Sequence, residues 1–303
     1  YYDVNSPAYE FEREVGDVKI YDNRYALSTG YAIPESFAEF TFANGANPFT
    51  NMNDMSKALG GSRVYNLNST RLIADNLDSD GTRTYEITAD DEEMLVYVQS
   101  SDIRKIDITV NGKNVYTGNR TMSVIDIGNV SKGDEINVIL TYTPDHGNDI
   151  TSLLYSASID NGAIAELYDK LSKEMFVTTG YSSDHIKGSI ELSEAGNVLF
   201  TIPNVKAESF IQKLLPEKAA KKYEEWFQAG GWKIKADGQE IDAGPWNDVF
   251  IMLKLDAGKH NIEMVYVTPG FYDGALISVI SVIIFIIALA ITLSHRRSRK
   301  LKE

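Results

Sequence analysis

The sequence predicts a mainly β protein: two tandem antiparallel β-sandwich domains of jelly-roll type, a few connecting helices and one C-terminal transmembrane helix. Three observations predict this. Short runs rich in β-branched residues are separated by tight-turn dipeptides, one pair of such runs occurs twice, and an uncharged apolar segment lies at 275–293. Short strands with regular turn signals are typical of a sandwich, and a long uncharged apolar run is typical of a membrane span.

The clearest predicted strands are 93–98 (EMLVYV), 106–110 (IDITV) and 136–142 (INVILTY), which are short and partly alternating in polarity. The dipeptides Asn111-Gly112 and Asp237-Gly238 separate such runs. Both central residues of a two-residue hairpin turn need a positive φ, which Asn, Asp and Gly adopt at low cost. These segments therefore predict antiparallel hairpins.

An internal repeat relates 108–144 to 234–269. In each copy a turn glycine (Gly112 or Gly238) is followed, 21 or 20 positions later, by a second glycine, and a Thr-Pro proline lies 11 positions beyond that. In the last strand, the alternation of apolar and polar residues is shifted by one position between the two copies. Such a shift moves the apolar side chains to the opposite face of the strand unless a bulge compensates for it. We expect that bulge near Val267, and we expect two related domains at 1–152 and 153–273, each with its own core.

Three helices are predicted before the C-terminal one. The first, 48–59, ends at Gly60-Gly61, a C-cap signal. The second, 162–175, carries Ile164, Leu167, Tyr168 and Leu171 on one face and is expected to connect the two domains. The third, 208–229, contains Pro216, so we expect two helical pieces with a break before the proline. It lies within a predicted insertion, 204–230, on the rim of the second domain.

The segment 275–293 has 19 residues without a charge, a length of roughly 28 Å as a helix, which matches the hydrocarbon thickness of a bilayer. We expect 274–294 to span the cell membrane. The tail 295–303 carries Arg296, Arg297, Arg299, Lys300 and Lys302 beside Glu303. Clustered basic residues mark the cytoplasmic side, so residues before the span are expected to be extracytoplasmic.

The charge balance excludes a nucleic-acid partner. The chain has 29 Lys+Arg and 43 Asp+Glu, and removing the five basic residues and Glu303 of the tail leaves 24 basic and 42 acidic residues, a net charge of −18. Such a surface is repelled by nucleic acid and by anionic lipid. The chain has no cysteine, which fits an exported bacterial protein. It begins without an export signal, so we expect a fragment that upstream sequence inserts into the membrane.

No catalytic, cofactor-binding or metal-binding residue is predicted, because the chain shows no metalloprotease, nucleophile-elbow or phosphate-loop motif. Asn76, Asp78, Asp80 and Gly81 resemble the first half of a calcium loop, but position twelve is Ile87 instead of Glu, so a turn between strands is the favoured interpretation. A solvated charge run is expected at 90–93. Structural surface roles are expected for the four histidines, His146, His185, His260 and His295.

Three tryptophans, Trp226, Trp232 and Trp246, cluster around the second predicted domain. Exposed aromatic rings can stack on sugars, so these residues are candidates for glycan stacking. The alternative is that they are core or rim anchors that pin the inserted helix.

Five segments in order resemble the C-terminal part of YfhO-like bacterial membrane proteins, and together they cover nearly the whole chain. They are 21–33 (YDNRYALSTGYAI), 47–61 (NPFTNMNDMSKALGG), 186–203 (IKGSIELSEAGNVLFTIP), 231–238 (GWKIKADG) and 257–270 (AGKHNIEMVYVTPG). The insertion at 204–230 departs from the family pattern, in which the Ile-Pro of the strand is followed almost directly by Gly-Trp.

The resemblance implies a large polytopic protein whose glycosyltransferase-C-like N-terminal half adds sugars to teichoic-acid polymers from a polyprenyl-phosphate sugar donor. The acidic catalytic residues of such proteins lie in that half, so none is carried over to this chain. We therefore expect a non-catalytic accessory region that positions a cell-envelope glycan acceptor or stabilises the remaining membrane domain. The alternative is a purely structural or protein-partner-binding module on a membrane anchor.

The predicted topology has a direct test. Protease added to intact cells is expected to digest the region before residue 274 and to spare the basic tail, because the bilayer separates the two. The reverse pattern, with only the last nine residues trimmed, would contradict the predicted orientation.

Overall fold

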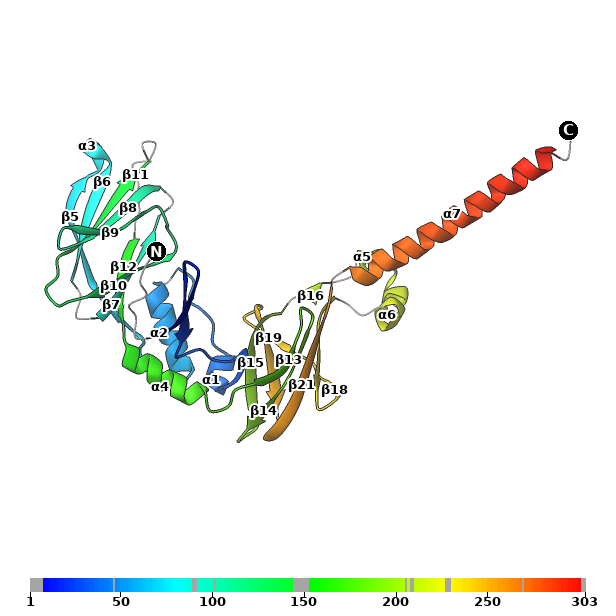
Figure 1. Cartoon of the computed structure of the whole chain (residues 1–303), viewed down its shortest axis with the longest axis horizontal. Helices are drawn as coiled ribbons and strands as arrows, with labels where there is room; N and C mark the ends of the chain where they lie inside the picture. The colour runs from blue at the N-terminus through cyan, green and yellow to red at the C-terminus, as the bar shows by residue number, and fades with distance from the viewer. Residues whose placement is uncertain are drawn as a thin grey trace. The chain divides into compact units, whose positions relative to one another are not determined.

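The computed structural model describes residues 8–45, 47–88, 92–100, 102–143, 153–204, 206–207, 210–226, 230–268 and 270–300. These residues form antiparallel sheets with few helices, which confirms the predicted mainly β fold (Figure 1). The chain divides into two compact units. Unit 1 comprises Tyr1–Leu27 and Ile33–Lys173, and unit 2 comprises Ser28–Ala32 and Glu174–Glu303.

Unit 1 contains two sheets that pack face to face. One has the order β10 (Val124–Val130), β7 (Glu92–Gln99), β12 (Leu153–Ile159), β4 (Tyr65–Leu67). The other has the order β5 (Ser69–Asn76), β6 (Thr82–Thr88), β11 (Ile136–Tyr142), β8 (Ile103–Val110), β9 (Lys113–Gly118). Met94 and Val96 of the first sheet share one buried core with Ile106 and Val138 of the second. Burial of both inner faces is what makes this unit a sandwich.

The remaining elements of unit 1 are a hairpin and short helices. The hairpin is β1 (Tyr9–Val15) with β2 (Val18–Asn23), and the helices are α1 (Glu35–Ala38), α2 (Pro48–Ala58), α3 (Leu77–Asp80) and α4 (Asn161–Leu171). β12 pairs with β7, and α4 groups with the same unit, so this grouping differs from the predicted domain boundary after residue 152.

Unit 2 is built in the same way. One sheet has the order β13 (Val177–Tyr181), β14 (His185–Leu192), β21 (Gly258–Val267), β17 (Gly230–Ala236), β16 (Lys206–Ala207), with β18 (Gln239–Glu240) also paired to β17. The other has the order β19 (Gly244–Trp246), β20 (Phe250–Leu255), β15 (Gly196–Pro203), β3 (Gly30–Ile33). Side chains of both sheets form one buried core, which includes Phe200, Ile234 and Leu253.

The strand β3 was not predicted, and it brings a segment from the start of the chain into unit 2. Gly30 of β3 lies against the Phe200 ring, where an added Cβ would be 2.6 Å from the ring. Only a residue without a side chain allows this approach. The core of unit 2 therefore depends on residues that precede most of unit 1 in sequence.

The two predicted turns are confirmed, and they are anchored in the same way. Asn111 and Asp237 both have a positive φ and are each followed by a glycine with a positive φ. The Asn111 side chain accepts a hydrogen bond from the Glu135 N–H, and the Asp237 carboxylate accepts one from the Asn261 N–H. The first turn is thus tied to the chain just before β11, and the second to a residue within β21. This contact is the structural counterpart of the sequence repeat.

The predicted bulge near Val267 is wrong. β21 pairs with β17 in regular register up to the pair Gly231↔Val267. It also pairs in regular register with every residue of β14. Gly133 lies three residues before Ile136, whereas Gly258 lies four residues before Ile262, so the one-residue difference is absorbed where the strand begins. The register irregularity in the repeat lies instead between Thr141 and Tyr142, where β11 pairs with β8.

The predicted helices are present, with changed ends. α2 (Pro48–Ala58) lies within one residue of the predicted 48–59, and its N-cap is Asn47, whose side chain accepts from the Phe49 N–H. α4 ends at Leu171 instead of residue 175, because Met175 forms an antiparallel bridge with Tyr31. The insertion folds as α5 (Phe210–Leu214) and α6 (Glu217–Trp226), separated at Pro216 as predicted. The last helix, α7 (Phe271–Lys300), contains an apolar stretch, Phe271–His295, that is long enough to cross a membrane.

The close packing around Gly188 of β14 leads to a stability prediction. A Cβ on Gly188 would lie closer than 3.0 Å to the Val177 carbonyl oxygen and the Phe176 ring, whereas one on Gly196 would meet nothing within 4 Å. Gly188→Ala is expected to destabilise unit 2 by about 2 kcal/mol through overpacking, and Gly196→Ala to be nearly neutral. All three tryptophans belong to unit 2, so thermal unfolding followed by tryptophan fluorescence reports on this unit. Equal melting temperatures for the two variants would contradict the prediction.

The Asp237 turn generates a pH prediction. His260 Nδ1 lies 2.8 Å from the Asp237 carboxylate, and this hydrogen bond raises the pKa of His260 above 6.5. The bonds from the Asn261 N–H and from His260 lower the pKa of Asp237. The stabilisation by protonated His260 is complete below pH 6.5 and is lost as the pH rises through the raised pKa. His260→Gln is expected to remove this loss, which amounts to about 0.5 kcal/mol.

The measurement is the free energy of unfolding of unit 2 on both sides of that pKa. The wild-type protein should become less stable relative to His260→Gln as the pH rises. An unchanged difference between the two proteins across this range would show that the ion pair contributes nothing.

Candidate functional site

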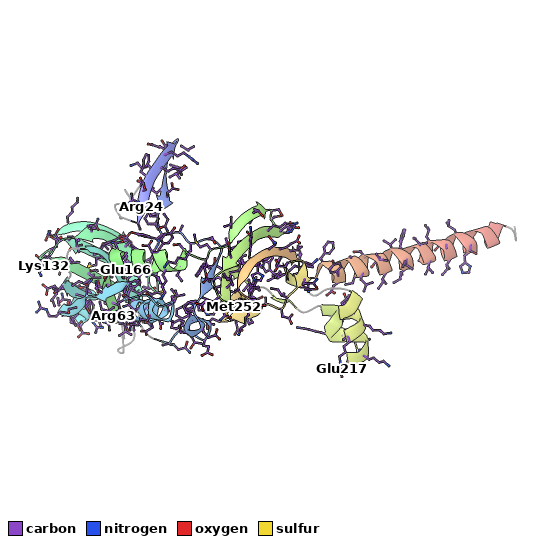
Figure 2. The ribbon with its side chains drawn as sticks, turned by 90° about the horizontal axis from the view of Figure 1, so that it is seen from below. Arg24, Arg63, Lys132, Glu166, Glu217 and Met252 are labelled. Atoms are coloured by element: carbon purple, nitrogen blue, oxygen red, sulfur yellow. The ribbon has the colours of Figure 1, made fainter. Side chains whose placement is uncertain are left out.

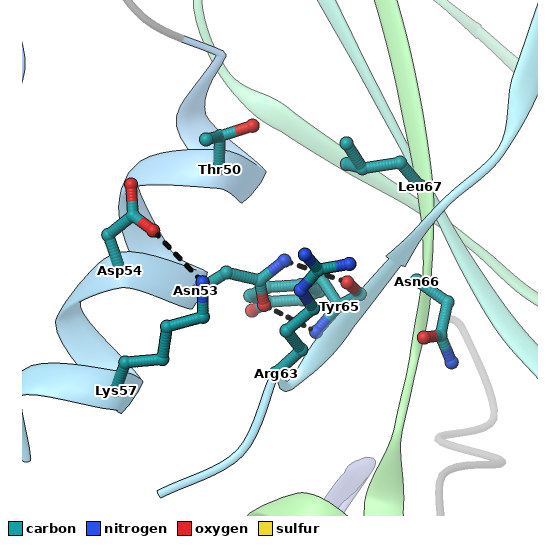
Figure 3. A pocket seen from close by; sticks show the side chains of 8 residues that line it. All are labelled: Thr50, Asn53, Asp54, Lys57, Arg63, Tyr65, Asn66 and Leu67. Atoms are coloured by element: carbon teal, nitrogen blue, oxygen red, sulfur yellow. Dashed lines mark hydrogen bonds and ion pairs between the residues drawn. The ribbon is translucent and has the colours of Figure 1, made fainter. Parts of the chain in front are cut away.

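A cavity of about 380 Å³ in unit 1 lies between α2 and β4 (Figure 3). We call it the α2–β4 pocket. All but one of its lining residues carry a polar side-chain group: Thr50, Asn53, Asp54, Lys57, Arg63, Tyr65 and Asn66 do, and Leu67 does not. The four helical residues are spaced three or four apart, so they lie on one face of α2.

Asn53 fixes the two walls of the pocket relative to each other. Its side-chain oxygen accepts hydrogen bonds from the Val64 and Tyr65 N–H groups, both at 2.9 Å, and its amide nitrogen donates to the Tyr65 carbonyl oxygen at 2.8 Å. Asn53 is buried. Because a buried amide with these three partners cannot leave without losing all of them, α2 holds the first residues of β4 in place.

The rim carries two cationic side chains. Lys57 forms an exposed ion pair with Asp54 at 3.6 Å, one helical turn away. Arg63 is exposed beside the start of β4, and Figure 3 shows its guanidinium group over the pocket, near Asn53 and Tyr65. A guanidinium group presents donors in a planar fork that matches phosphate and carboxylate groups.

Tyr65 contributes a neutral phenol. Its ring contacts Phe49 with centroids 5.4 Å apart. Burial, and then the negative charge of Glu93, raise the pKa of Tyr65. The phenol therefore stays protonated at neutral pH and can donate a hydrogen bond. Glu93 itself is buried in β7, so the predicted solvated charge run at 90–93 is wrong at this residue, while 90 and 91 lie outside the described residues.

The α2–β4 pocket has the composition of a binding site for a polar, anionic ligand. It offers two cations, amide donors and a phenol, whereas Asp54 is its only carboxylate. Acid–base hydrolysis of a glycoside uses two carboxylates in one site, and the lining supplies one. Among the described residues, no group of three or more His, Asp or Glu is placed to hold a metal ion.

Two of the predicted stacking residues, Trp232 and Trp246, lie in opposite sheets of unit 2. Trp246, in β19, is 4% exposed and stacks on Phe250. Trp232, in β17 of the opposite sheet, is half-buried and contacts Tyr266 with centroids 5.1 Å apart. Trp226 ends α6, but its side chain lies outside the described residues. This placement favours packing for Trp246, and glycan stacking stays a prediction for the other two.

Three of the remaining candidates, Asp80, His185 and His260, have structural partners. The 76–81 segment forms α3, a helical turn between β5 and β6 in which Asp80 accepts from the Thr82 N–H and hydroxyl groups. The predicted turn is therefore present. His185 lies 2.8 Å from Glu263, and His260 contacts Asp237. His146 lies outside the described residues, and His295 is exposed on α7.

Sequence reasoning predicted α2 as a helix but missed the pocket. One sequence signal could have indicated it: the polar residues 50, 53, 54 and 57 form a hydrophilic face on this helix. Phe49, on the other face, is buried. The partner residues on β4 lie up to 17 positions away, and sequence spacing does not reveal that they face α2.

Comparison with known proteins identifies a family. The model described as "Bacterial membrane protein YfhO" matches residues 2–207 and 228–278. No curated protein matches this chain.

Solved structures give only distant likenesses. A GH2 beta-galacturonidase from Eisenbergiella tayi is 9% identical, with 69% of this chain and 38% of that chain covered and a TM-score of 0.23. A calcium-binding mutant of Bacteroides uniformis beta-glucuronidase 2 is 14% identical, with 65% and 23% covered and a TM-score of 0.21. A conserved protein of unknown function from Pseudomonas aeruginosa is 12% identical, with 68% and 90% covered and a TM-score of 0.18. This chain spans well under half of each enzyme, and likenesses this weak carry no argument.

Proposed function

Because the chain belongs to the YfhO family of bacterial membrane proteins, we propose that it is the extracytoplasmic accessory region of a membrane glycosyltransferase that acts on teichoic-acid-type polymers of the cell envelope. In this proposal the α2–β4 pocket holds a stretch of the anionic glycan acceptor. α7 tethers the chain to the bilayer, and the basic tail lies in the cytoplasm.

The observation that carries the proposal is that Lys57 and Arg63 both line a preorganised pocket, in which the one carboxylate, Asp54, is paired with Lys57. A teichoic-acid-type polymer presents phosphodiester groups and polyol hydroxyls. Arg63 can bind a phosphodiester through two parallel N–H donors. Asn66 and Tyr65 can hydrogen-bond the neighbouring hydroxyls. The pocket therefore matches both components of such a polymer.

The acidic character of the whole chain makes the local cations decisive. A net charge of −14 weakens long-range attraction of any polyanion. At physiological ionic strength, however, charges farther apart than about 8 Å are largely screened. The ligand would then respond mainly to Lys57 and Arg63 at close range, so binding should be local and should weaken with added salt.

The chemistry in this proposal belongs to the remaining polytopic membrane domain, which is the proposed partner. Holding the acceptor on a tethered domain raises its effective concentration at a membrane-embedded active site without any chemical step. This fits a pocket with one carboxylate on its lining.

A structural role is the second candidate, and the packing of the tryptophans favours it. Trp246 is buried and Trp232 is half-buried against the core of unit 2, which leaves them as anchors of the fold. In this reading the units stabilise the membrane domain or bind a protein partner. The ligand-binding test below separates the two candidates.

Arg63→Gln in the full chain, reconstituted in nanodiscs, is expected to weaken binding of a purified poly(glycerol phosphate) wall polymer roughly tenfold. The loss of one charge-assisted hydrogen-bonded contact accounts for about that factor. Arg120→Gln is the matched control, because Arg120 is an exposed arginine of unit 1 that does not line the pocket. Calorimetric titration at two salt concentrations measures both affinities.

Three outcomes are decisive. A selective loss in Arg63→Gln supports the pocket. Equal losses in both variants would mean that the polymer senses only total charge. Wild-type protein that does not bind the polymer, with sugar transfer unchanged when unit 1 is deleted from the parent protein, would leave the structural role.

A further inference from the structure

The helical insertion of unit 2 stands apart from the rest of the chain. α5 and α6 lie in the connection between β16 and β17, two strands that pair directly with each other. The family model matches up to residue 207 and again from 228, and it leaves this stretch unmatched. The insertion therefore has no explanation in the pattern that this chain shares with the family.

The insertion is attached to the first turn of α7. The Tyr223 hydroxyl of α6 donates a hydrogen bond to Asp273 Oδ1, and the Ile211 N–H of α5 donates to Asp273 Oδ2 at 3.4 Å. Tyr223 and Asp273 are each 7% exposed. Asp273 also lies where the positive end of the helix dipole favours a carboxylate. One buried acidic side chain thus holds both inserted helices at the point where α7 begins.

This attachment determines how close to a bilayer the insertion lies. The apolar stretch of α7 begins at Phe271, next to Asp273, so the first turn of α7 lies at the membrane interface if the stretch crosses the membrane. Figures 1 and 2 show α6 beside the start of α7 and running across the axis of α7 instead of along it. A helix in this position lies along the membrane surface.

The exposed surface of the insertion suits such a position. Ala219, Ala220 and Tyr223 lie on the covered face of α6, whereas Lys218, Lys221 and Lys222 are exposed. Leu214 at the end of α5 is 68% exposed, and Phe271 at the start of α7 is 63% exposed. Large apolar side chains and lysines together are typical of helices that bind at the interface of an anionic bilayer.

The charge of the insertion also differs from that of the chain. Residues 210–226 contain four lysines and three glutamates, against an excess of 14 acidic charges in the whole chain. The overall acidity predicts repulsion from anionic lipid. The insertion instead carries four lysines against three glutamates, a net charge of +1, beside the first turn of α7.

We propose that α5 and α6 form an interfacial anchor, which docks on the anionic lipid headgroups of the bilayer surface from which α7 emerges and buries Leu214 at the headgroup–acyl boundary. The proposal rests on the proposed membrane span of α7. It gives unit 2 a second attachment to the membrane, and two attachments restrict the orientation of a domain that a single helix leaves free to swing.

The absence of cysteine allows a direct test with single-cysteine variants of the full chain. Leu214→Cys, Gln239→Cys and Ile284→Cys are labelled with an environment-sensitive fluorophore and reconstituted in vesicles of phosphatidylcholine with or without phosphatidylglycerol. Gln239 is the exposed first residue of β18, at the end of the sheet where β21 begins and therefore away from α7. Ile284 lies in the middle of the apolar stretch of α7.

The Leu214 label is expected to be quenched by aqueous iodide roughly threefold less than the Gln239 label, because an interfacial helix buries its apolar side chains below the headgroups. The protection should be greater with phosphatidylglycerol. Replacing Lys218, Lys221 and Lys222 together by Gln should remove this lipid dependence. The same replacement of Lys235, Lys254 and Lys259, exposed lysines on the strands of unit 2, is the matched control and should leave it unchanged.

Each result decides between specific alternatives. A shielded Ile284 label with a Leu214 label as accessible as the Gln239 label would overturn the interfacial anchor and leave the membrane span intact. An accessible Ile284 label would overturn the span and the anchor together. Protection of Leu214 that is independent of phosphatidylglycerol and of the three lysines would overturn the role of anionic headgroups.

Discussion

The apolar surface of α7 constrains the rest of this chain, because no other described part of the protein covers it. None of its most apolar stretch is buried within the structure. An exposed surface of this kind is stable only in lipid, where a helix satisfies its own backbone hydrogen bonds. The side chains obey the same requirement. Ser278, Ser281 and Thr292 each donate to the carbonyl oxygen four residues earlier at 2.8 Å, so these three hydroxyl groups find their acceptors within the helix itself.

The two units share the same anchored turn, although few residues are identical between the two copies of the sequence repeat. Asn111 and Asp237 differ in charge, yet each accepts a backbone hydrogen bond from the neighbouring strand region, from the Glu135 N–H just before β11 or from the Asn261 N–H within β21. The turn requires a residue that tolerates a positive φ and carries a short acceptor, and both Asn and Asp meet that requirement. The pairing of β8 with β11, and of β17 with β21, then follows from the same anchored end.

The α2–β4 pocket and the insertion use buried polar contacts for the same physical purpose. Asn53 ties α2 to β4 through three hydrogen bonds, and Asp273 ties α5 and α6 to α7 through two. Buried polar groups of this kind hold one arrangement, because any alternative leaves them without partners. In both places the exposed side of the tied elements carries lysine or arginine on a chain that is otherwise acidic, which is the basis of both proposals made for them.

The sequence by itself determined the fold class, the strands 93–98, 106–110 and 136–142, both tight turns, the break at Pro216 and the apolar helix. These features follow from local rules: side-chain alternation, the φ preferences of Asn, Asp and Gly, the missing N–H of proline and the length of an apolar run. Only the tertiary structure decided that β3 belongs to unit 2, that the repeat needs no bulge in β21, that Trp246 is buried, and that α2 and β4 enclose a pocket. Each of those features depends on contacts between residues that are distant in sequence, such as Gly30 with Phe200 or Asn53 with Tyr65. Such contacts produce no periodic pattern in a single sequence, so they could not be predicted from it.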